Sequence, residues 1–152
     1  AYWRAASYER VQTAVDAWSQ SERVTLVVVG EIPDPDRVCQ LDDAFNQGYI
    51  SICIGEQVFV GSIALSQQEC QTLPEPDPNC WSYHFTAGKV LHYSPLPKTE
   101  HIMHEIGHTL GLWHQSGTIM QADGRVTAIT QTDYANLASI MAIWIYNRKR
   151  AL

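Results

Sequence analysis

The segment from His104 to His114 reads His-Glu-Ile-Gly-His-Thr-Leu-Gly-Leu-Trp-His, and it constrains the fold more than any other part of the chain. His104 and His108 are four residues apart, so on one helix they lie a turn apart on the same face. Their ring nitrogens can then reach one metal ion at about 2.0–2.1 Å. Gly111 allows the helix to end in the left-handed conformation, after which the chain can bring His114 back as a third ligand. The spacing therefore predicts a metal-binding helix followed by a sharp turn.

The donor set is typical of a catalytic zinc site. Three protein ligands leave the fourth tetrahedral position open, whereas a structural site closes with a fourth Cys or His, and none stands in this segment. Glu105 follows the first ligand, where its carboxylate can hold a water without binding the metal. We expect His104, His108 and His114 to bind one Zn²⁺ and Glu105 to act as general base. A chance match on a surface helix is the alternative, against which the third histidine argues.

The motif resembles that of the metzincin zinc peptidases, in which a methionine-containing turn (the Met-turn) follows the third histidine. Ser116–Met120 is similar to that turn. The resemblance implies that Met120 is an apolar floor beneath the metal. An ordinary core methionine is the alternative, and the two are compatible.

Outside residues 104–120 the similarity is weaker and is greatest to the matrixin branch. Ala14–Ser19 with Val24–Val29 resembles the first helix and strand of that branch, and Ile129–Asp133 resembles the start of its last helix. Gln115 and the short link from the third histidine to the methionine depart from it. The residues therefore support a resemblance to the metzincins as a whole. They do not decide which metzincin branch the chain resembles.

The resemblance implies an α/β (α+β) fold with a twisted mixed β-sheet, an active-site helix, a Met-turn and a C-terminal helix. Val58–Leu65 would be an antiparallel edge strand beside the cleft, and a peptide could bind by adding a strand to it. An interior strand with no exposed rim is the alternative. His101, three residues before His104, would line the pocket next to the metal, with simple surface exposure as an equal alternative.

The implied activity is zinc-dependent hydrolysis of protein or peptide bonds by an activated water. One alternative is a processing peptidase of narrow specificity. Another is a zinc-bearing binding module without turnover, against which the intact Glu105 argues.

Length and composition predict one catalytic domain over 1–152, with an N-terminal subdomain of about 1–111 and a small C-terminal one of about 112–152. The net charge of −6 argues against a nucleic-acid partner. Apolar runs are too short to span a bilayer, so we expect no membrane partner. We expect a monomer that acts on a peptide or protein. The chain opens without a basic-then-apolar segment, which is typical of a mature or trimmed form.

Four cysteines lie outside the histidine motif. An even number predicts two disulfides and an oxidising compartment, and hence a secreted, extracellular protein. Three pairings are possible, of which we favour Cys39–Cys53 and Cys70–Cys80. Buried thiols are the alternative.

Two further sets of residues could hold ions. His84 and His92 could form a second zinc site as in matrixins, but the accompanying aspartates are missing, so surface or hydrogen-bonded imidazoles are the better interpretation. Calcium has weak support, because the acidic loop residues lack ordered ligand spacing. These residues are Asp34, Asp36, Glu75 and Asp77.

Hydrophobic periodicity predicts the remaining elements. A helix is expected over 4–20, and strands over Thr25–Val29 (buried), Tyr49–Ile54 and Lys89–Tyr93.

Turn and capping residues set the element boundaries. Pro33–Asp36 is expected to be a loop. Thr99 is predicted as the N-cap of the metal-binding helix, and Thr130 with Asp133 as the start of the last helix.

Overall fold

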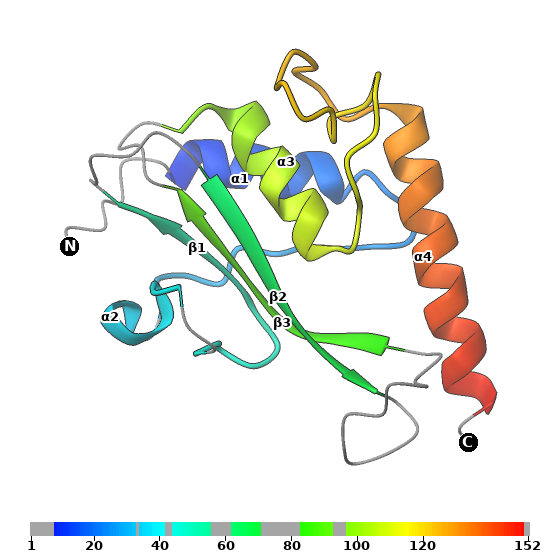
Figure 1. The fold of residues 1–152 in the computed structure, drawn as a ribbon, viewed down its shortest axis with the longest axis horizontal. Coiled ribbons are helices and arrows are strands. Elements are labelled where there is room, and N and C mark those ends of the chain that lie inside the picture. Colours follow the sequence, from blue (N-terminus) through cyan, green and yellow to red (C-terminus); the bar gives the residue numbers. More distant parts are fainter. Residues whose placement is uncertain are drawn as a thin grey trace.

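The computed structural model describes residues 8–32, 34–41, 44–55, 62–70, 83–92 and 97–150. Within these residues, three strands form one sheet. The strands are β1 (Ile50–Ile54), β2 (Ser62–Cys70) and β3 (Tyr83–His92), in the order β1-β3-β2 (Figure 1). β1 runs parallel to β3, and β2 runs antiparallel to it. The architecture is therefore mixed α and β with a mixed sheet, as predicted at that level.

The edge strand lies where the sequence predicts it. β2 borders only β3 in the described sheet, and its ladder begins with Ser62 opposite His92. Residues 58–61 of the predicted strand lie outside the described residues, and the strand continues to Cys70. β3 begins six residues before the predicted Lys89, because the ladder with β2 extends back to Tyr83.

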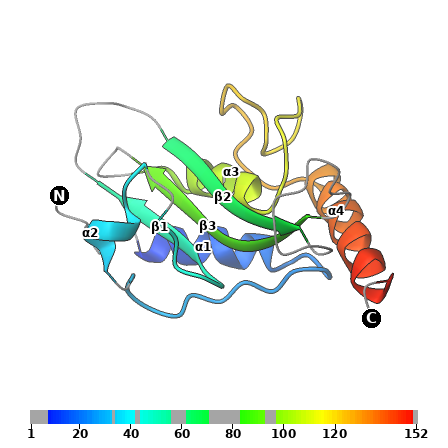
Figure 2. The same ribbon diagram turned by 60° about the horizontal axis from the view of Figure 1, so that its bottom comes forward.

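Two helices form one layer over the sheet. α3 (Thr99–Thr109) packs against β2 and β3, and α1 (Tyr8–Trp18) packs against α3. Figure 2 shows the strands in front of both helices. Ala14, Val15 and Trp18 form the buried face of α1, as their helical spacing predicts. The Trp18 indole also donates to the carbonyl of Met103 at 2.9 Å, which fixes α1 against the helix that carries the histidines.

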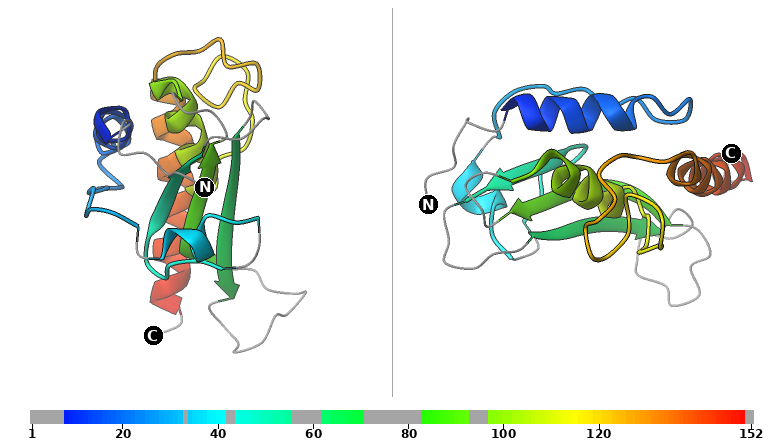
Figure 3. Two further views of the ribbon diagram at one scale, coloured as in Figure 1. Left: turned by 90° about the vertical axis from the view of Figure 1, so that its left-hand side faces the viewer. Right: turned by 90° about the horizontal axis from the view of Figure 1, so that it is seen from above.

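α4 (Gln131–Arg150) begins directly after Thr130, as Thr130 and Asp133 predict. It stands at one end of the sheet in the right-hand view of Figure 3. Leu137 is fully buried and Ile140 packs against the core. No helix within the described ranges is long and apolar enough to cross a membrane.

Thr25–Val29 does not form the predicted buried strand. The segment is not helical, and no ladder joins it to the described sheet. Leu26 and Val28 pack against the core, whereas Val27 and Val29 are 71% and 73% exposed. The β-branched composition favours extended backbone, but it does not supply a partner strand.

Two local predictions were also wrong. The predicted loop over Pro33–Asp36 runs into a single helical turn, α2 (Pro35–Val38), because Pro35 at the first position loses no hydrogen bond there. Lys98, and not Thr99, is the N-cap of α3, and it caps without a side-chain hydrogen bond.

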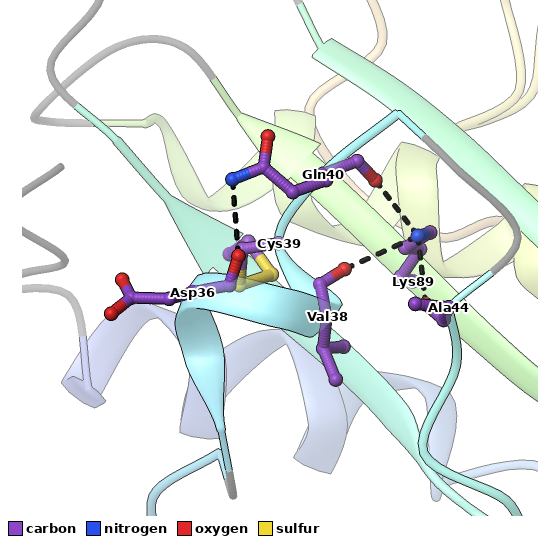
Figure 4. The surroundings of a disulfide bond; sticks show 7 residues. Asp36, Val38, Cys39, Gln40, Ala44 and Lys89 are labelled. Atoms are coloured by element: carbon purple, nitrogen blue, oxygen red, sulfur yellow. Dashed lines mark hydrogen bonds between the residues drawn. A yellow bond between two sulfur atoms is a disulfide. The ribbon is translucent and has the colours of Figure 1, made fainter.

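A disulfide and a buried lysine attach the segment around α2 to the sheet (Figure 4). Cys39 and Cys53, which are 14 residues apart in the sequence, form the predicted disulfide bond. Cys80, of the second predicted pair, lies outside the described residues. Lys89 on β3 is fully buried, and its Nζ donates to the carbonyls of Val38 at 3.2 Å, Gln40 at 2.8 Å and Ala44 at 2.8 Å.

Replacing Lys89 by methionine keeps the length of the side chain but leaves these carbonyl oxygens without their shared donor. We expect the free energy of unfolding to fall by about 2–4 kcal/mol. Urea denaturation followed by circular dichroism measures it. Lys98→Met, at an exposed lysine, is the control and should change stability by less than about 0.5 kcal/mol. A loss no larger than the control's would show that the lysine is dispensable.

Candidate metal centre

α3, the helix that carries His104 and His108, ends just before Gly111, as that glycine predicts. α3 stops at Thr109, and Gly111 has a φ of +94°. The N–H of Gly111 donates to the carbonyl of His108 at 3.0 Å, and that of Leu112 to the carbonyl of Gly107 at 3.0 Å. This pair of bonds is the Schellman motif, which satisfies the last carbonyls of the helix and reverses the chain.

The reversal brings three imidazoles together. One nitrogen from each of His104, His108 and His114 lies within 4.8 Å of the other two, and among the described residues these form a group able to hold a metal ion. His108 Nε2 is 3.1 Å from both His104 Nε2 and His114 Nε2. Ligands about 2.0–2.1 Å from a tetrahedral ion stand about 3.3 Å apart, so the spacing fits such an ion.

The hydrogen bonds on the far side of two rings fix their tautomer. His104 Nδ1 is 2.8 Å from the carbonyl oxygen of Ile119, and His108 Nδ1 is 2.8 Å from that of Leu112. A carbonyl can only accept, so each Nδ1 carries a proton, and in the neutral imidazole Nε2 then presents a lone pair. Two lone pairs at 3.1 Å repel each other, and a cation between them removes the repulsion. The residues therefore fit a metal ion, and the imidazole donors are consistent with zinc.

The turn predicted as the Met-turn supports the same ring. Ile119, whose carbonyl holds His104, precedes Met120, which is 1% exposed and lies in the core. A Cβ built on Gly107 would collide with the sulfur of Met120 and come within 3.0 Å of Trp18. Gly107 therefore makes room for Met120 directly against α3, the helix that carries His104 and His108.

A buried aspartate connects this turn to α4. Asp133 is fully buried, and its Oδ2 accepts from the N–H of Ile119 at 3.0 Å. The same oxygen accepts from the N–H and the hydroxyl of Thr130, both at 2.8 Å. Beside it, burial and the Asp133 carboxylate raise the pKa of Tyr134. The Tyr134 hydroxyl donates to the carbonyl of Ala17 at 2.6 Å.

Glu105 is adjacent to the first histidine and is 7% exposed. Its Oε1 accepts a hydrogen bond of 2.5 Å from the hydroxyl of Ser62 on β2. Sequence reasoning predicted Glu105 and missed Ser62, because a lone serine 43 residues away carries no spacing signal. It also missed the bond from Asp133 to Ile119, although it recognised Asp133 as a helix-start residue.

A cavity of about 400 Å³ adjoins His104, and both His101 and Glu105 line part of it. Its wall includes Ser62, His92, His101, Glu105, Ile119 and Gln121. The half-buried His101 therefore lies in a cavity wall. Its ring stacks on that of His92, with centroids 6.1 Å apart.

Among the residues that the structure describes, His92 and Asp34 do not join the trio. His92 is buried and belongs to the cavity wall, and the side chain of His84 lies outside the described residues. Asp34 forms an ion pair with Arg37 at 3.2 Å. Glu75 and Asp77 lie outside the described residues, so the calcium hypothesis stays a prediction.

Comparison with known proteins adds no assignment. No family model, curated protein or solved structure matches this chain.

Zinc should bind with one ion per chain, and His108→Ala should weaken it by more than about 100-fold, since even losses of outer hydrogen bonds cost 10–100-fold at such sites. Competition with a chromophoric chelator measures the affinity. His101→Ala, an imidazole removed from the same helix, is the control and should keep the ion. Equal binding by His108→Ala and the wild type would contradict the assignment.

Asp133→Ala should lower the free energy of unfolding by about 2–4 kcal/mol, because it leaves the N–H groups of Ile119 and Thr130 without their acceptor. Zinc affinity should fall about 10-fold as the carbonyl of Ile119 loosens from His104. Denaturation and chelator competition measure the two effects. Asp123→Ala at an exposed carboxylate is the control, and a matching loss there would contradict the role of Asp133.

Proposed function

We propose that the chain is a zinc-dependent endopeptidase of the metzincin type, which hydrolyses peptide bonds within proteins or peptides. The observation that carries the proposal is the convergence of three imidazole nitrogens next to a buried carboxylate at the wall of a cavity. A structural zinc site needs neither the carboxylate nor the cavity. The combination of open coordination, base and adjoining space is what hydrolysis requires.

The metal, when bound, supplies Lewis acidity that polarises the scissile carbonyl and makes water more acidic. The work of the protein is then to hold and move protons. His104 and His108 keep their protons on Nδ1, bonded to the carbonyls of Ile119 and Leu112, so that Nε2 remains a ligand atom. Glu105 takes the proton of the attacking water and passes it to the leaving amine.

The substrate is a peptide in extended conformation. β2 is an edge strand in the described sheet and packs against α3, so a peptide that adds to this edge would lie close to the histidines. The cavity lined by His101 would receive the side chain that follows the cleaved bond. Its volume of about 400 Å³ is ample for a side chain.

The proposed setting is extracellular. The disulfide between Cys39 and Cys53 is the kind of bond that persists in oxidising compartments. We propose a secreted monomer with a metzincin-like division into an N-terminal part of about 1–111 and a C-terminal part of about 112–152.

Glu105→Ala should keep its zinc and its fold but lose hydrolysis of a generic protein substrate by at least about 100-fold, which is the scale of general-base catalysis. Elemental analysis and cleavage of a fluorescent casein measure the two properties. Glu100→Ala, a carboxylate removed from the same helix, should keep both.

The same assay separates the alternatives. Full activity of Glu105→Ala would overturn the role of the carboxylate. Zinc-loaded wild type that leaves casein intact but cuts members of a peptide library would indicate a narrow processing peptidase. Zinc-loaded wild type that cuts neither would indicate a binding module.

A further inference from the structure

We propose that Ser62 is a positioning residue that holds the carboxylate of Glu105 in place from the edge strand. The inference rests on the proposed function and deepens it, because it concerns how the general base is oriented. It assigns a role in hydrolysis to a residue outside the histidine motif.

The hydrogen bond itself is short and joins two elements. Ser62 Oγ donates to Glu105 Oε1 at 2.5 Å, across 43 residues of sequence. This distance is at the short end of hydroxyl–carboxylate bonds, which are roughly twice as strong as neutral ones. The carboxylate is nearly buried and the serine half-buried, so water competes little for either group.

The serine is held firmly enough to orient its partner. Ser62 begins the antiparallel ladder of β2 with β3, where it stands opposite His92, and the next pair is Ile63 opposite Leu91. Its backbone is therefore fixed by the sheet, while Glu105 is fixed by α3. A glutamate side chain has three rotatable bonds, and a fixed donor on one oxygen selects among its rotamers.

The bond leaves the second carboxylate oxygen available for chemistry. Within the described residues, Glu105 Oε2 has no hydrogen-bond partner. Ser62 thus anchors Oε1 while Oε2 can take the proton of the attacking water. Because Ser62 belongs to the strand that would bind the substrate, base and substrate are placed by the same element.

The test is the rate of peptide hydrolysis by zinc-loaded Ser62→Ala. We expect kcat to fall about 10–100-fold, the cost of a base misplaced by about 1 Å, with KM nearly unchanged. Ser62→Thr keeps the hydroxyl and should restore most of kcat. Ser66→Ala, at an exposed serine of the same strand, should behave as the wild type.

Three results would overturn the inference. They are a kcat of Ser62→Ala close to the wild-type value, an equal loss in Ser66→Ala, and no recovery in Ser62→Thr. A merely structural hydroxyl would lower the melting temperature without this selective loss of kcat.

A second measurement needs no turnover and separates this inference from the proposed function. Ser62→Ala is made in the wild type and in Glu105→Ala, and the melting temperatures of the zinc-loaded proteins are compared. If the hydroxyl acts through the carboxylate, the drop caused by Ser62→Ala should largely vanish in the Glu105→Ala background. Equal drops in both backgrounds would overturn the link. If the wild type proves inactive, this comparison still decides whether the Ser62 hydroxyl and the Glu105 carboxylate interact.

Discussion

The hydrogen bonds from His104 Nδ1 to Ile119 and from His108 Nδ1 to Leu112 determine what the rest of the site can be. Each bond fixes a proton on the outer nitrogen and a lone pair on the inner one. Without them the rings could adopt the other tautomer and form hydrogen bonds to each other. The site would then be a polar cluster and would not attract a cation.

The two carbonyls come from segments whose conformation is itself constrained. Leu112 lies in the Schellman turn that Gly111 permits. Ile119 is held through its N–H by Asp133, at the start of α4. The first turn of the last helix therefore reaches His104 through two successive hydrogen bonds. This arrangement gives α4 a part in the site although it supplies no ligand.

The sequence predicts the features that depend on short-range spacing. The trio of histidines, the end of α3 at a glycine, the buried face of α1 and the start of α4 all follow from offsets of a few residues. Long-range contacts leave no such trace: the partner of Glu105 is a serine on another strand, and Lys89 reaches carbonyls about fifty residues away. The segment Thr25–Val29 shows the same limit, because its composition favours extended chain while pairing depends on what lies beside it.

The carbonyl oxygens around Lys89 bind a side-chain ammonium group in a place where many other folds bind a metal ion. Oxygen atoms converging from one loop are the usual setting for a bound calcium ion. Here the positive charge is covalently part of β3, with the ring of Phe45 4.6 Å from the ammonium nitrogen. A chelating agent cannot extract a charge that belongs to the polypeptide. Depleting the medium of divalent ions would thus remove any metal ion that the histidines hold, while the loop around Val38 and Gln40 would keep its anchor.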